Sequence, residues 1–351
     1  MTASPAITIV IPNYNGSKLL QTCLGSIYHQ SYANFSVTVV DNGSSDGSIA
    51  LIQKDYPKIH LIAFDHNRGF SSAVNEGIRQ SEAPWIFLLN NDTELAPDCL
   101  DALIRSAELY PEADFFALKM VNFFQRHLLD GAGDGLFIGG AGYRIGTMEV
   151  DCPEYNCFRP VFGACAGAAF YKRSFFDTVG WFDESFFAYL EDVDINLRAA
   201  RLGLKCLYAP DAKIYHMGSQ TTGSRLNPFT VSHTTTNAIH VIVKNYPLTI
   251  IQKKWPQILI YHIWWFFVAA VNHQTPAYFK GLKQAFQELP NTIKNRNNLR
   301  WCSTISEKEL LDRIMTSEGE VFKSILRRRM QQGKSQWLIR LYMKAFNLGK
   351  K

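Results

Sequence analysis

The sequence predicts an α/β fold, because apolar segments typical of buried strands alternate with segments of helical periodicity. The apolar segments are residues 7–11, 37–40, 60–64 and 85–89, and a polar loop and a helical pattern follow each of them. Three of these strands end in loops rich in Asn, Asp, Gly and Ser. Because ligands of open α/β sheets bind beyond the carboxyl ends of the strands, the pattern indicates a nucleotide-binding domain.

The segment 85–89 carries the most informative of these loops. Its five apolar residues follow Pro84, which is typical of a strand buried on both faces of a parallel sheet. The residues that follow it are Asn90, Asn91 and Asp92, and such oxygen-rich clusters suit a hard divalent cation and the phosphates that it carries. The alternative is a polar turn in which Asp92 or Thr93 caps the helix predicted over residues 96–110.

The composition predicts one sizeable catalytic domain with an appendage. The chain has 351 residues, of which 47% are hydrophobic and 19% charged. Its seven cysteines include one close pair, Cys152 and Cys157, without a second pair at zinc spacing, so we expect reduced thiols in a cytosolic compartment. Pro12 and Asn13 interrupt the first apolar segment, so no signal peptide is expected.

Two common nucleotide-binding motifs do not occur in the sequence. No Gly-x-Gly-x-x-Gly follows the first strand, which weakens an interpretation as a dinucleotide-binding protein. No Gly-Lys-Ser/Thr motif occurs either, which weakens an interpretation as a phosphate-loop NTPase.

Four motifs occur in an order that is more specific than the alternation of strands and helices. They are Ile-Pro-Asn-Tyr-Asn (11–15), Val-Val-Asp-Asn-Gly-Ser-Ser-Asp-Gly-Ser (39–48), Asn-Arg-Gly-Phe (67–70) and Leu-Asn-Asn-Asp-Thr (89–93). Over residues 6–219 the chain resembles the inverting glycosyltransferases of family 2, most of all their bacterial rhamnosyltransferase-type members. The resemblance implies a GT-A fold, with a mixed sheet flanked by helices, a nucleotide-sugar donor and transfer of one sugar to a hydroxyl with inversion. It also implies a divalent cation, Mg²⁺ or Mn²⁺.

The resemblance assigns residues to the donor site. Pro12, Asn13 and Tyr14 would line the nucleoside pocket, and Asp41 would hydrogen-bond the base. The further residues implied at the donor are Asn67, Gly69, Asn90, Asn91, Asp92 and Arg225. Because Asn90 stands where the Asp-x-Asp motif of the family has its first carboxylate, Asp92 is the main charged metal ligand.

A second informative segment spans residues 182–198. Glu191 and Asp192 precede a helical face and lie where a helix dipole favours carboxylates by about 0.3–1 kcal/mol, which is a purely structural explanation. In the family the matching pair contains the base that deprotonates the acceptor. We therefore expect Asp192 to be the base, with Glu191 as the alternative, and we expect Asp194 and Arg198 to form a structural pair.

The remaining site residues also follow from the resemblance. His216 occupies a position where similar enzymes use a metal or diphosphate ligand, although a lone histidine is usually a packing residue. Arg225, at the end of the loop 219–225, could neutralise charge on the leaving group. Gly167 and Asp183 are expected at the acceptor, with close packing of small residues as the alternative for Gly167. The glycine-rich residues 129–150 are interpreted as a mobile loop or hairpin nearby.

The catalytic domain is expected over residues 1–225, and residues 226–351 are expected to form a mainly helical extension. Residues 258–271 are strongly apolar but shorter than the roughly 20 residues that span a bilayer, which favours a buried or interfacial helix. Residues 337–346 combine an apolar helical face with a basic remainder, and no acidic residue follows Glu320. This pattern favours an anionic membrane surface over a nucleic acid as the partner.

The predicted acceptor is a saccharide or a lipid-linked saccharide in cell-surface polysaccharide synthesis, with the protein peripheral on the cytoplasmic face of the cell membrane. Three alternatives compete with this hypothesis. A sugar-1-phosphate nucleotidyltransferase would need a basic, glycine-rich first loop, which residues 12–16 do not supply. A processive synthase would need membrane spans and a Gln-x-x-Arg-Trp motif, and a non-catalytic sugar-binding module would not need Glu191 and Asp192.

Overall fold

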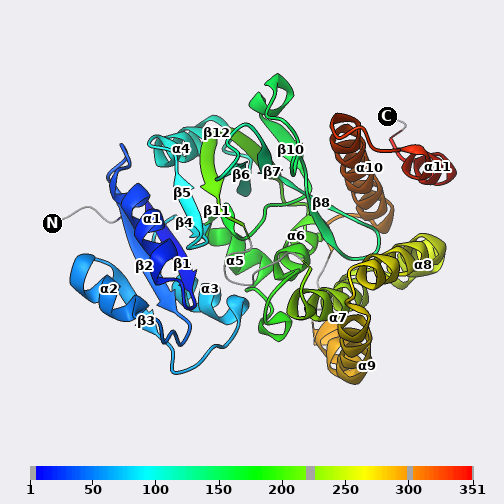
Figure 1. The fold of residues 1–351 in the computed structure, drawn as a ribbon, viewed down its shortest axis with the longest axis horizontal. Helices are drawn as coiled ribbons and strands as arrows, with labels where there is room; N and C mark the ends of the chain where they lie inside the picture. The colour runs from blue at the N-terminus through cyan, green and yellow to red at the C-terminus, as the bar shows by residue number, and fades with distance from the viewer. Residues whose placement is uncertain (1–4, 219–225, 299–302, 350–351) are drawn as a thin grey trace.

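The computed structural model describes residues 5–218, 226–298 and 303–349 of the chain. Arg225, which the resemblance assigns to the donor phosphates, lies outside these residues. A sheet lies at the centre of the molecule with helices on both of its faces, and the C-terminal helices gather at one end (Figure 1).

The strands of the central sheet are β1 (Ile7–Asn13), β2 (Phe35–Asp41), β3 (His60–Ala63), β4 (Trp85–Leu89), β5 (Thr93–Leu95), β6 (Phe115–Asn122), β7 (Leu129–Ala132), β10 (Arg159–Val161), β11 (Ala168–Lys172) and β12 (Cys206–His216). Within the described residues they form one sheet whose main path is β10-β12-β6-β11-β4-β1-β2-β3, with β5 on β12 and β7 on β6. β1 is parallel to both β2 and β4, whereas β11 is antiparallel to β4 and β6. The sheet is therefore mixed, as predicted, although β4 has one antiparallel neighbour.

Helices cover both faces of this sheet. They are α1 (Ser17–Tyr28), α2 (Ser48–Asp55), α3 (Phe70–Arg79), α4 (Cys99–Leu109), α5 (Arg173–Val179) and α6 (Glu191–Arg201). Apolar residues of α1, α2 and α4 pack on one face, and those of α3, α5 and α6 pack on the other. Because successive strand residues point to opposite faces, the continuous apolar segments of the sequence supply both cores at once.

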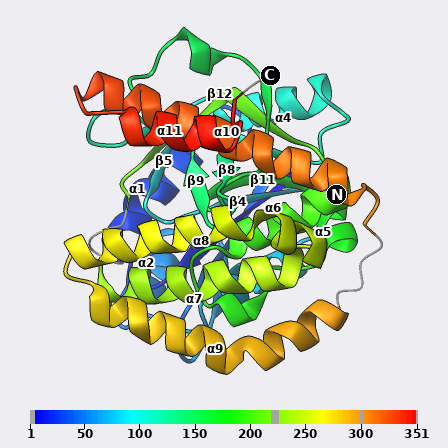
Figure 2. The ribbon, with the colours of Figure 1, turned by 90° about the vertical axis from the view of Figure 1, so that its right-hand side faces the viewer.

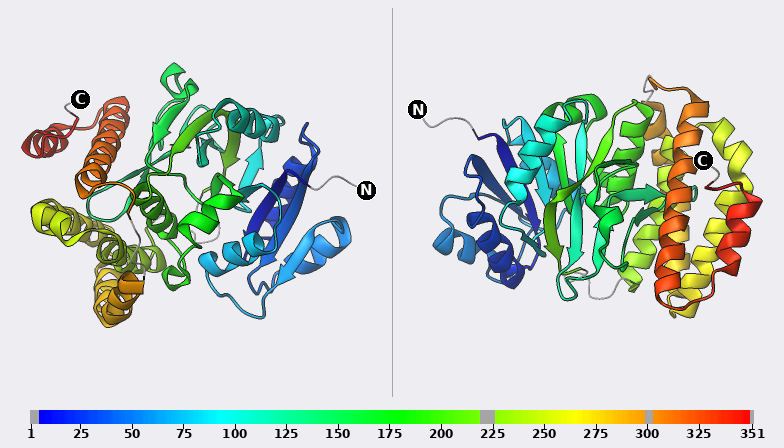
Figure 3. Two further views of the ribbon diagram at one scale, coloured as in Figure 1. Left: turned by 180° about the vertical axis from the view of Figure 1, so that it is seen from behind. Right: turned by 90° about the horizontal axis from the view of Figure 1, so that it is seen from above.

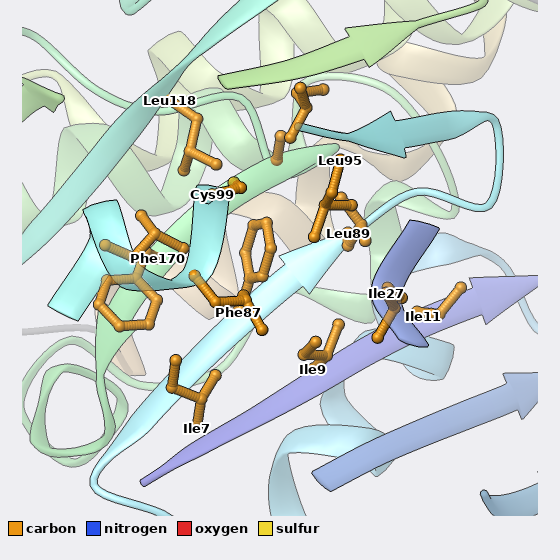
Figure 4. Close-up of a cluster of buried hydrophobic side chains, with 14 of the residues drawn as sticks. Ile7, Ile9, Ile11, Ile27, Phe87, Leu89, Leu95, Cys99, Leu118 and Phe170 are labelled. Atoms are coloured by element: carbon orange, nitrogen blue, oxygen red, sulfur yellow. The ribbon is translucent and has the colours of Figure 1, made fainter. Parts of the chain in front are cut away.

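Figure 4 shows the first of these cores. Ile7, Ile9 and Ile11 of β1 lie beside Phe87 and Leu89 of β4, and all five side chains are fully buried. This packing fixes the positions at which β1 and β4 end, and the polar residues that follow both strands therefore meet at one edge of the sheet.

The glycine-rich residues 129–150 form ordered strands. β7 joins the central sheet, and β8 (Asp134–Leu136) pairs with β9 (Gly142–Arg144) as an antiparallel hairpin. In the register of this hairpin Asp134 lies opposite Arg144. The hairpin alternative of the prediction is therefore correct for residues 134–144. The many small residues of this segment conceal the alternation of apolar and polar residues that would indicate strands.

Two strands are longer than their continuous apolar segments. The segments 206–208 and 213–215 belong to one strand, β12, with an irregularity between Ala209 and Lys213. Pro12 does not end the first strand, because β1 continues to Asn13 and pairs there with Asp41.

The C-terminal helices are α7 (Pro228–Asn245), α8 (Leu248–Val271), α9 (Thr275–Asn298), α10 (Glu307–Gln331) and α11 (Trp337–Ala345). They gather at the end of the molecule opposite β3 (Figure 3). Two apolar clusters join them to the β8–β9 hairpin and to α6. Among the described residues, no helix has both the length and the apolar character needed to cross a membrane.

Candidate active site

The loops after β1 and β2 are tied together by buried hydrogen bonds. Nδ2 of Asn13 donates to Oδ2 of Asp41 over 2.8 Å, and the backbone N–H of Ser44 donates to Oδ1 of the same carboxylate over 2.8 Å. Nδ2 of Asn91 donates to Oδ1 of Asn13 over 2.7 Å, which extends the network to the loop after β4. Asp41 is thus fully buried, and both of its oxygens accept hydrogen bonds from the protein.

Asn67 and Gly69 form the next part of the same edge. Oδ1 of Asn67 accepts from Nδ2 of Asn42 over 3.0 Å and from the backbone of Gly69 over 2.9 Å. Gly69 has a φ of +88°, and a Cβ there would lie 2.6 Å from the carbonyl oxygen of Phe187. The loop after β3 therefore contacts the segment that leads into α6.

Asn90 lies against the small-residue segment before β11. Its backbone N–H donates to the carbonyl of Gly167 over 2.8 Å, and a Cβ on Gly167 would approach Nδ2 of Asn90 to 3.0 Å. Gly167 thus keeps the backbone close to Asn90. Tyr14 and Pro12 lie on the solvent side of this edge, Tyr14 being exposed and Pro12 half-buried.

Asp92 and His216 face each other at the ends of β4 and β12. Oδ1 of Asp92 is buried, accepts no hydrogen bond from the described residues, and lies 3.4 Å from Nε2 of His216. On the other side of the ring, Nδ1 of His216 lies 2.6 Å from Oδ2 of Asp130. Histidines that bind metals usually donate their second N–H to such a carboxylate, so this arrangement fits a divalent cation held by Asp92 and His216.

Arg144 lies beside this arrangement and adds a fixed positive charge. Its Nη1 forms an ion pair with Oδ2 of Asp130 and lies 3.3 Å from Nδ1 of His216. Burial alone would lower the pKa of His216, but the hydrogen bond with Asp130 and the nearby negative charge of Asp92 outweigh burial and raise this pKa. The two carboxylates lie on opposite sides of the ring and hold it with Nε2 directed at Asp92.

Glu191 and Asp192 form the first turn of α6 and differ in environment. Glu191 is 7% exposed, and its Oε2 has no hydrogen-bond partner among the described residues. Burial, and then the charge of Asp192, raises the pKa of Glu191 to about 8. Asp192 is half-buried, and its carboxylate accepts from the backbone of Val193 over 2.8 Å and of Ala166 over 3.4 Å.

The segment before α6 has an unusual backbone. Phe187, Tyr189 and Leu190 have φ values of +57°, +69° and +65°, a region that costs energy for residues with a Cβ. Nδ2 of Asn237, on α7, donates to the carbonyls of Phe186, Ala188 and Tyr189 over 3.0, 3.0 and 2.7 Å. The C-terminal helices thus stabilise the turn that sets the direction of Asp192.

Asp134 and Cys165 complete the surroundings of Asp192. Ligand atoms of Asp134, Cys165 and Asp192 all lie within 4.8 Å of one another. Burial raises the pKa of Asp192, and hydrogen bonds from the backbone of Val193 and Ala166 oppose this effect. Burial, and then the charge of Asp192, also raises the pKa of Asp134.

Asp183, which the resemblance places at the acceptor, lies in an ion pair with Lys244. Its Oδ2 lies 2.5 Å from Nζ of Lys244 on α7, and its Oδ1 accepts from the backbone of Ser185 over 2.9 Å. Lys244 also pairs with Asp194, whose other oxygen contacts Arg198. Asp183 therefore takes part in a structural ion-pair network, and Asp194 and Arg198 form the predicted pair.

The structure brings together most of the predicted site residues and adds others. Asp92, Asn90, Gly167, Asp192 and His216 converge at one edge of the sheet. The residues that the sequence analysis did not assign are Asp130, Asp134, Arg144, Cys165 and Asn237. The closely spaced Asp130 and Asp134 in a glycine-rich segment were the one available signal for part of this set.

The order of strands, the two helical layers and the polar edge define a GT-A glycosyltransferase fold. One solved structure of this class is a polypeptide described as GalNAc-T7 with UDP, GalNAc and Mn²⁺, which matches with a TM-score of 0.56 at 14% identity over 70% of this chain and 48% of that one. Residues 1–349 of TarS from S. aureus in complex with UDP-GlcNAc match with a TM-score of 0.54 at 16% identity, over 93% of this chain and 92% of that one.

Sequence comparison identifies the family. Residues 8–180 match the family described as Glycosyl transferase family 2. The chain is 27% identical over 239 residues to the N-acetylglucosaminyl-diphospho-decaprenol L-rhamnosyltransferase of Mycobacterium tuberculosis, covering 62% of this chain and 78% of the relative. It is 26% identical over 201 residues to a PGL/p-HBAD biosynthesis glycosyltransferase of Mycobacterium bovis, covering 56% of this chain and 70% of that one. Residues 8–180 belong to glycosyltransferase family 2, and the protein is a glycosyltransferase.

Proposed function

We propose that the protein is an inverting, metal-dependent glycosyltransferase that moves one sugar from a nucleotide-diphosphate sugar to a hydroxyl of a saccharide or lipid-linked acceptor. Rhamnose is the leading candidate for the sugar, because the relative in M. tuberculosis is described as an L-rhamnosyltransferase. Synthesis of a cell-surface polysaccharide is the corresponding role. The catalytic domain would be residues 1–225, and residues 226–351 would be the helical extension.

One observation carries this proposal. A half-buried carboxylate, Asp192, and the facing pair Asp92 and His216 lie on the same side of the sheet, and Arg144 is close enough to both to act on them electrostatically. Single displacement at an anomeric carbon needs a base at the acceptor and positive charge at the leaving diphosphate. The two requirements correspond to these two sets of residues.

The proposed chemistry is a single displacement. The acceptor oxygen attacks the anomeric carbon, the bond from that carbon to the diphosphate oxygen breaks, and Asp192 takes the proton of the acceptor hydroxyl. Such general-base assistance is typically worth about 10²–10⁴-fold in rate. A divalent cation held by Asp92 and His216 supplies, when bound, charge that stabilises the leaving diphosphate.

The loops after β1, β2 and β4 would bind the donor. Pro12, Asn13 and Tyr14 would contact the nucleoside, and the buried Asp41 would order the loop that receives the base. Asn90 and Asn91 would offer neutral oxygens near the phosphates. Arg225 would neutralise charge on the leaving group, and Gly167 would lie at the acceptor. Asp183 would affect the acceptor indirectly, because its carboxylate pairs with Lys244.

The proposed location is the inner face of the cell membrane. A lipid-linked acceptor, such as the one in the name of the M. tuberculosis relative, would be presented there. The described cysteines are all free.

A transfer assay tests the proposal. The purified protein is incubated with a panel of nucleotide sugars, including nucleoside-diphosphate rhamnose and UDP-N-acetylglucosamine, and a polyprenyl-diphosphate N-acetylglucosamine acceptor. Release of nucleoside diphosphate should require Mn²⁺ or Mg²⁺ and stop with EDTA, and the anomeric configuration of the product, measured by NMR, should be inverted. Retention of configuration, or full transfer in EDTA, would contradict the mechanism.

A further inference from the structure

The outward face of α8 is apolar along most of its length. Its exposed side chains include Trp255, Leu259, Ile263, Phe267 and Val271, which are spaced four residues apart. Trp264 and Ile260 lie beside them and are also exposed. No Asp, Glu, Lys or Arg occurs from Trp255 to Phe279, although helices of globular proteins normally carry charged residues on their solvent side.

The last helix continues this surface. On α11 the residues Trp337, Leu338 and Leu341 are exposed, whereas Tyr342 is turned inward and lies beside Gln257 of α8. Figure 2 shows α8 and α11 on the same side of the molecule. We define the exposed apolar residues of these two helices as the α8–α11 face. A set of large exposed apolar side chains on one side of a molecule is typical of an interaction site.

The two helices of this face also carry exposed positive charges. Lys253 is exposed near the start of α8, and Arg340 and Lys344 are exposed on α11. No acidic residue follows Glu320 in the sequence. A second copy of the chain would bring like charges together across the face, whereas an anionic lipid surface would complement them. Exposed tryptophans beside cations are also typical of helices that lie in a bilayer interface.

The β8–β9 hairpin connects this face to the catalytic centre. At one end of β8 Asp134 lies beside Asp192, and immediately after its other end the ring of Phe137 packs 6.2 Å from that of Trp264 and 5.4 Å from that of Tyr261. Three residues of extended chain span about 10 Å. The proposed base is therefore one short strand away from the α8–α11 face.

We propose that the α8–α11 face docks the protein on an anionic bilayer, with α8 as the main contact and the β8–β9 hairpin holding the proposed base near the surface where a lipid-linked acceptor emerges. This inference rests on the proposed function for its acceptor. The contact itself depends only on the apolar residues and the cations of the two helices.

Vesicle binding by full-length variants tests the inference. Phe267→Glu and Leu338→Glu change residues that are 60% and 62% exposed, so neither variant disturbs a core. Both should bind vesicles of phosphatidylglycerol and phosphatidylcholine about tenfold or more weakly than the wild type, because a charge replaces the inserted side chain. Leu109→Glu is the matched control: this residue is 68% exposed on α4, remote from α8 and α11 in Figure 1, and its variant should bind as the wild type does.

The contribution of charge is tested separately. Arg340→Gln combined with Lys344→Gln should weaken binding to the phosphatidylglycerol vesicles and leave binding to pure phosphatidylcholine vesicles little changed. Equal weakening by Leu109→Glu, or unchanged binding by both Phe267→Glu and Leu338→Glu, would overturn the inference. Light scattering measures the oligomeric state. If the wild type were a dimer, and Phe267→Glu dissociated it without any loss of vesicle binding, the face would bind a second copy and the inference would be wrong.

The donor reaction keeps the two proposals apart. Metal-dependent release of nucleoside diphosphate in the absence of vesicles should be the same for the wild type, Phe267→Glu, Leu338→Glu and Leu109→Glu. Normal release together with absent vesicle binding would refute the docking face alone. Absent release together with the expected vesicle binding would refute the proposed transferase chemistry and leave the membrane contact standing.

Discussion

Nδ1 of His216 lies 2.6 Å from Oδ2 of Asp130, and Nε2 of the same ring faces Oδ1 of Asp92. Asp130 is almost fully buried and also pairs with Arg144, so its carboxylate can neither rotate into solvent nor leave the ring easily. The contact selects the orientation in which Nε2 is available to a metal ion.

Asp130→Asn should therefore weaken binding of Mn²⁺ by about tenfold or more, because an amide can turn its N–H₂ toward Nδ1 and favour the wrong tautomer. Titration of the free protein with Mn²⁺, followed by electron paramagnetic resonance, measures this without any turnover. Asp177→Asn, at an exposed ion pair on α5, is the control. An unchanged Mn²⁺ affinity in Asp130→Asn would remove Asp130 from the metal site.

Asp192→Asn should keep the affinity for the donor and lower turnover by about 10²-fold or more, because the amide retains the shape but cannot take a proton. Glu191→Gln should cost less, since Glu191 is buried away from the Asp134 and Cys165 cluster. The opposite ranking would make Glu191 the base. Near-normal turnover in both variants, measured with donor affinity and melting temperature, would exclude a catalytic role for the pair.

The stability of Glu191→Gln should depend on pH in a defined direction. Burial, followed by the charge of Asp192, raises the pKa of Glu191 from 4.5 to about 8 in the folded protein. Between these two pH values the unfolded chain has released the proton and the folded chain retains it, so the wild type loses stability as the pH rises through this window.

Glutamine cannot ionise, so Glu191→Gln should gain stability relative to the wild type from pH 5 to pH 8. The gain should reach about 1 kcal/mol or more, because one pKa unit corresponds to about 1.4 kcal/mol. Urea unfolding at several pH values measures the difference. Glu108→Gln, exposed on α4, should show a constant difference over the same range, and a constant difference for Glu191→Gln would contradict the raised pKa.

Asn237 should act as a positioning residue for Asp192. Asn237→Asp keeps the size but removes the N–H₂ group that binds three carbonyls of the strained turn before α6. Turnover should fall by about tenfold while KM for the donor changes little, because a small displacement of the base affects the transition state more than donor binding.

The control for this variant is Asn272→Ala, whose side chain caps only the end of α8. Stopped assays well below the melting temperature separate the two roles. If Asn237→Asp lowered the melting temperature but kept the wild-type turnover, the role of Asn237 would be structural.

The fold, and the polar residues at the ends of β1, β2 and β4, could be predicted because short segments of the sequence indicate them. The strands β1, β2 and β4 are continuous apolar segments, and the polar residues after them must meet because parallel strands end at one edge. For this reason Asn13, Asp41 and Asp92 could be named from the sequence. Asp192 could be proposed as the base because Glu191 and Asp192 match the carboxylate pair that contains the base in the family.

The other half depends on contacts between distant segments. Asp130 and Arg144 reach His216 across 86 and 72 residues of sequence, and the strands that carry them are short and rich in glycine, without a readable period. Asn237 lies on a helix whose sequence gives no reason to expect contact with the turn before α6. Asp183 was assigned to the acceptor from the resemblance, and its Lys244 partner, 61 residues away, could not be foreseen from the sequence.

The packing of α10 has a consequence for the way in which the enzyme becomes active during its synthesis. Glu149, which is 1% exposed, receives hydrogen bonds from Tyr155 over 2.7 Å and from Arg327 over 2.8 Å, and Ser324 contacts its other oxygen. A buried carboxylate left without its partners typically costs about 3–5 kcal/mol. A nascent chain that has not yet released α10 from the ribosome keeps Tyr155 but lacks Ser324 and Arg327 as partners of Glu149. It also lacks Ser317, whose hydroxyl accepts a hydrogen bond from the backbone of Leu136 in the β8–β9 hairpin. Sugar transfer would begin only after α10 has been translated and has packed against Glu149 and the hairpin.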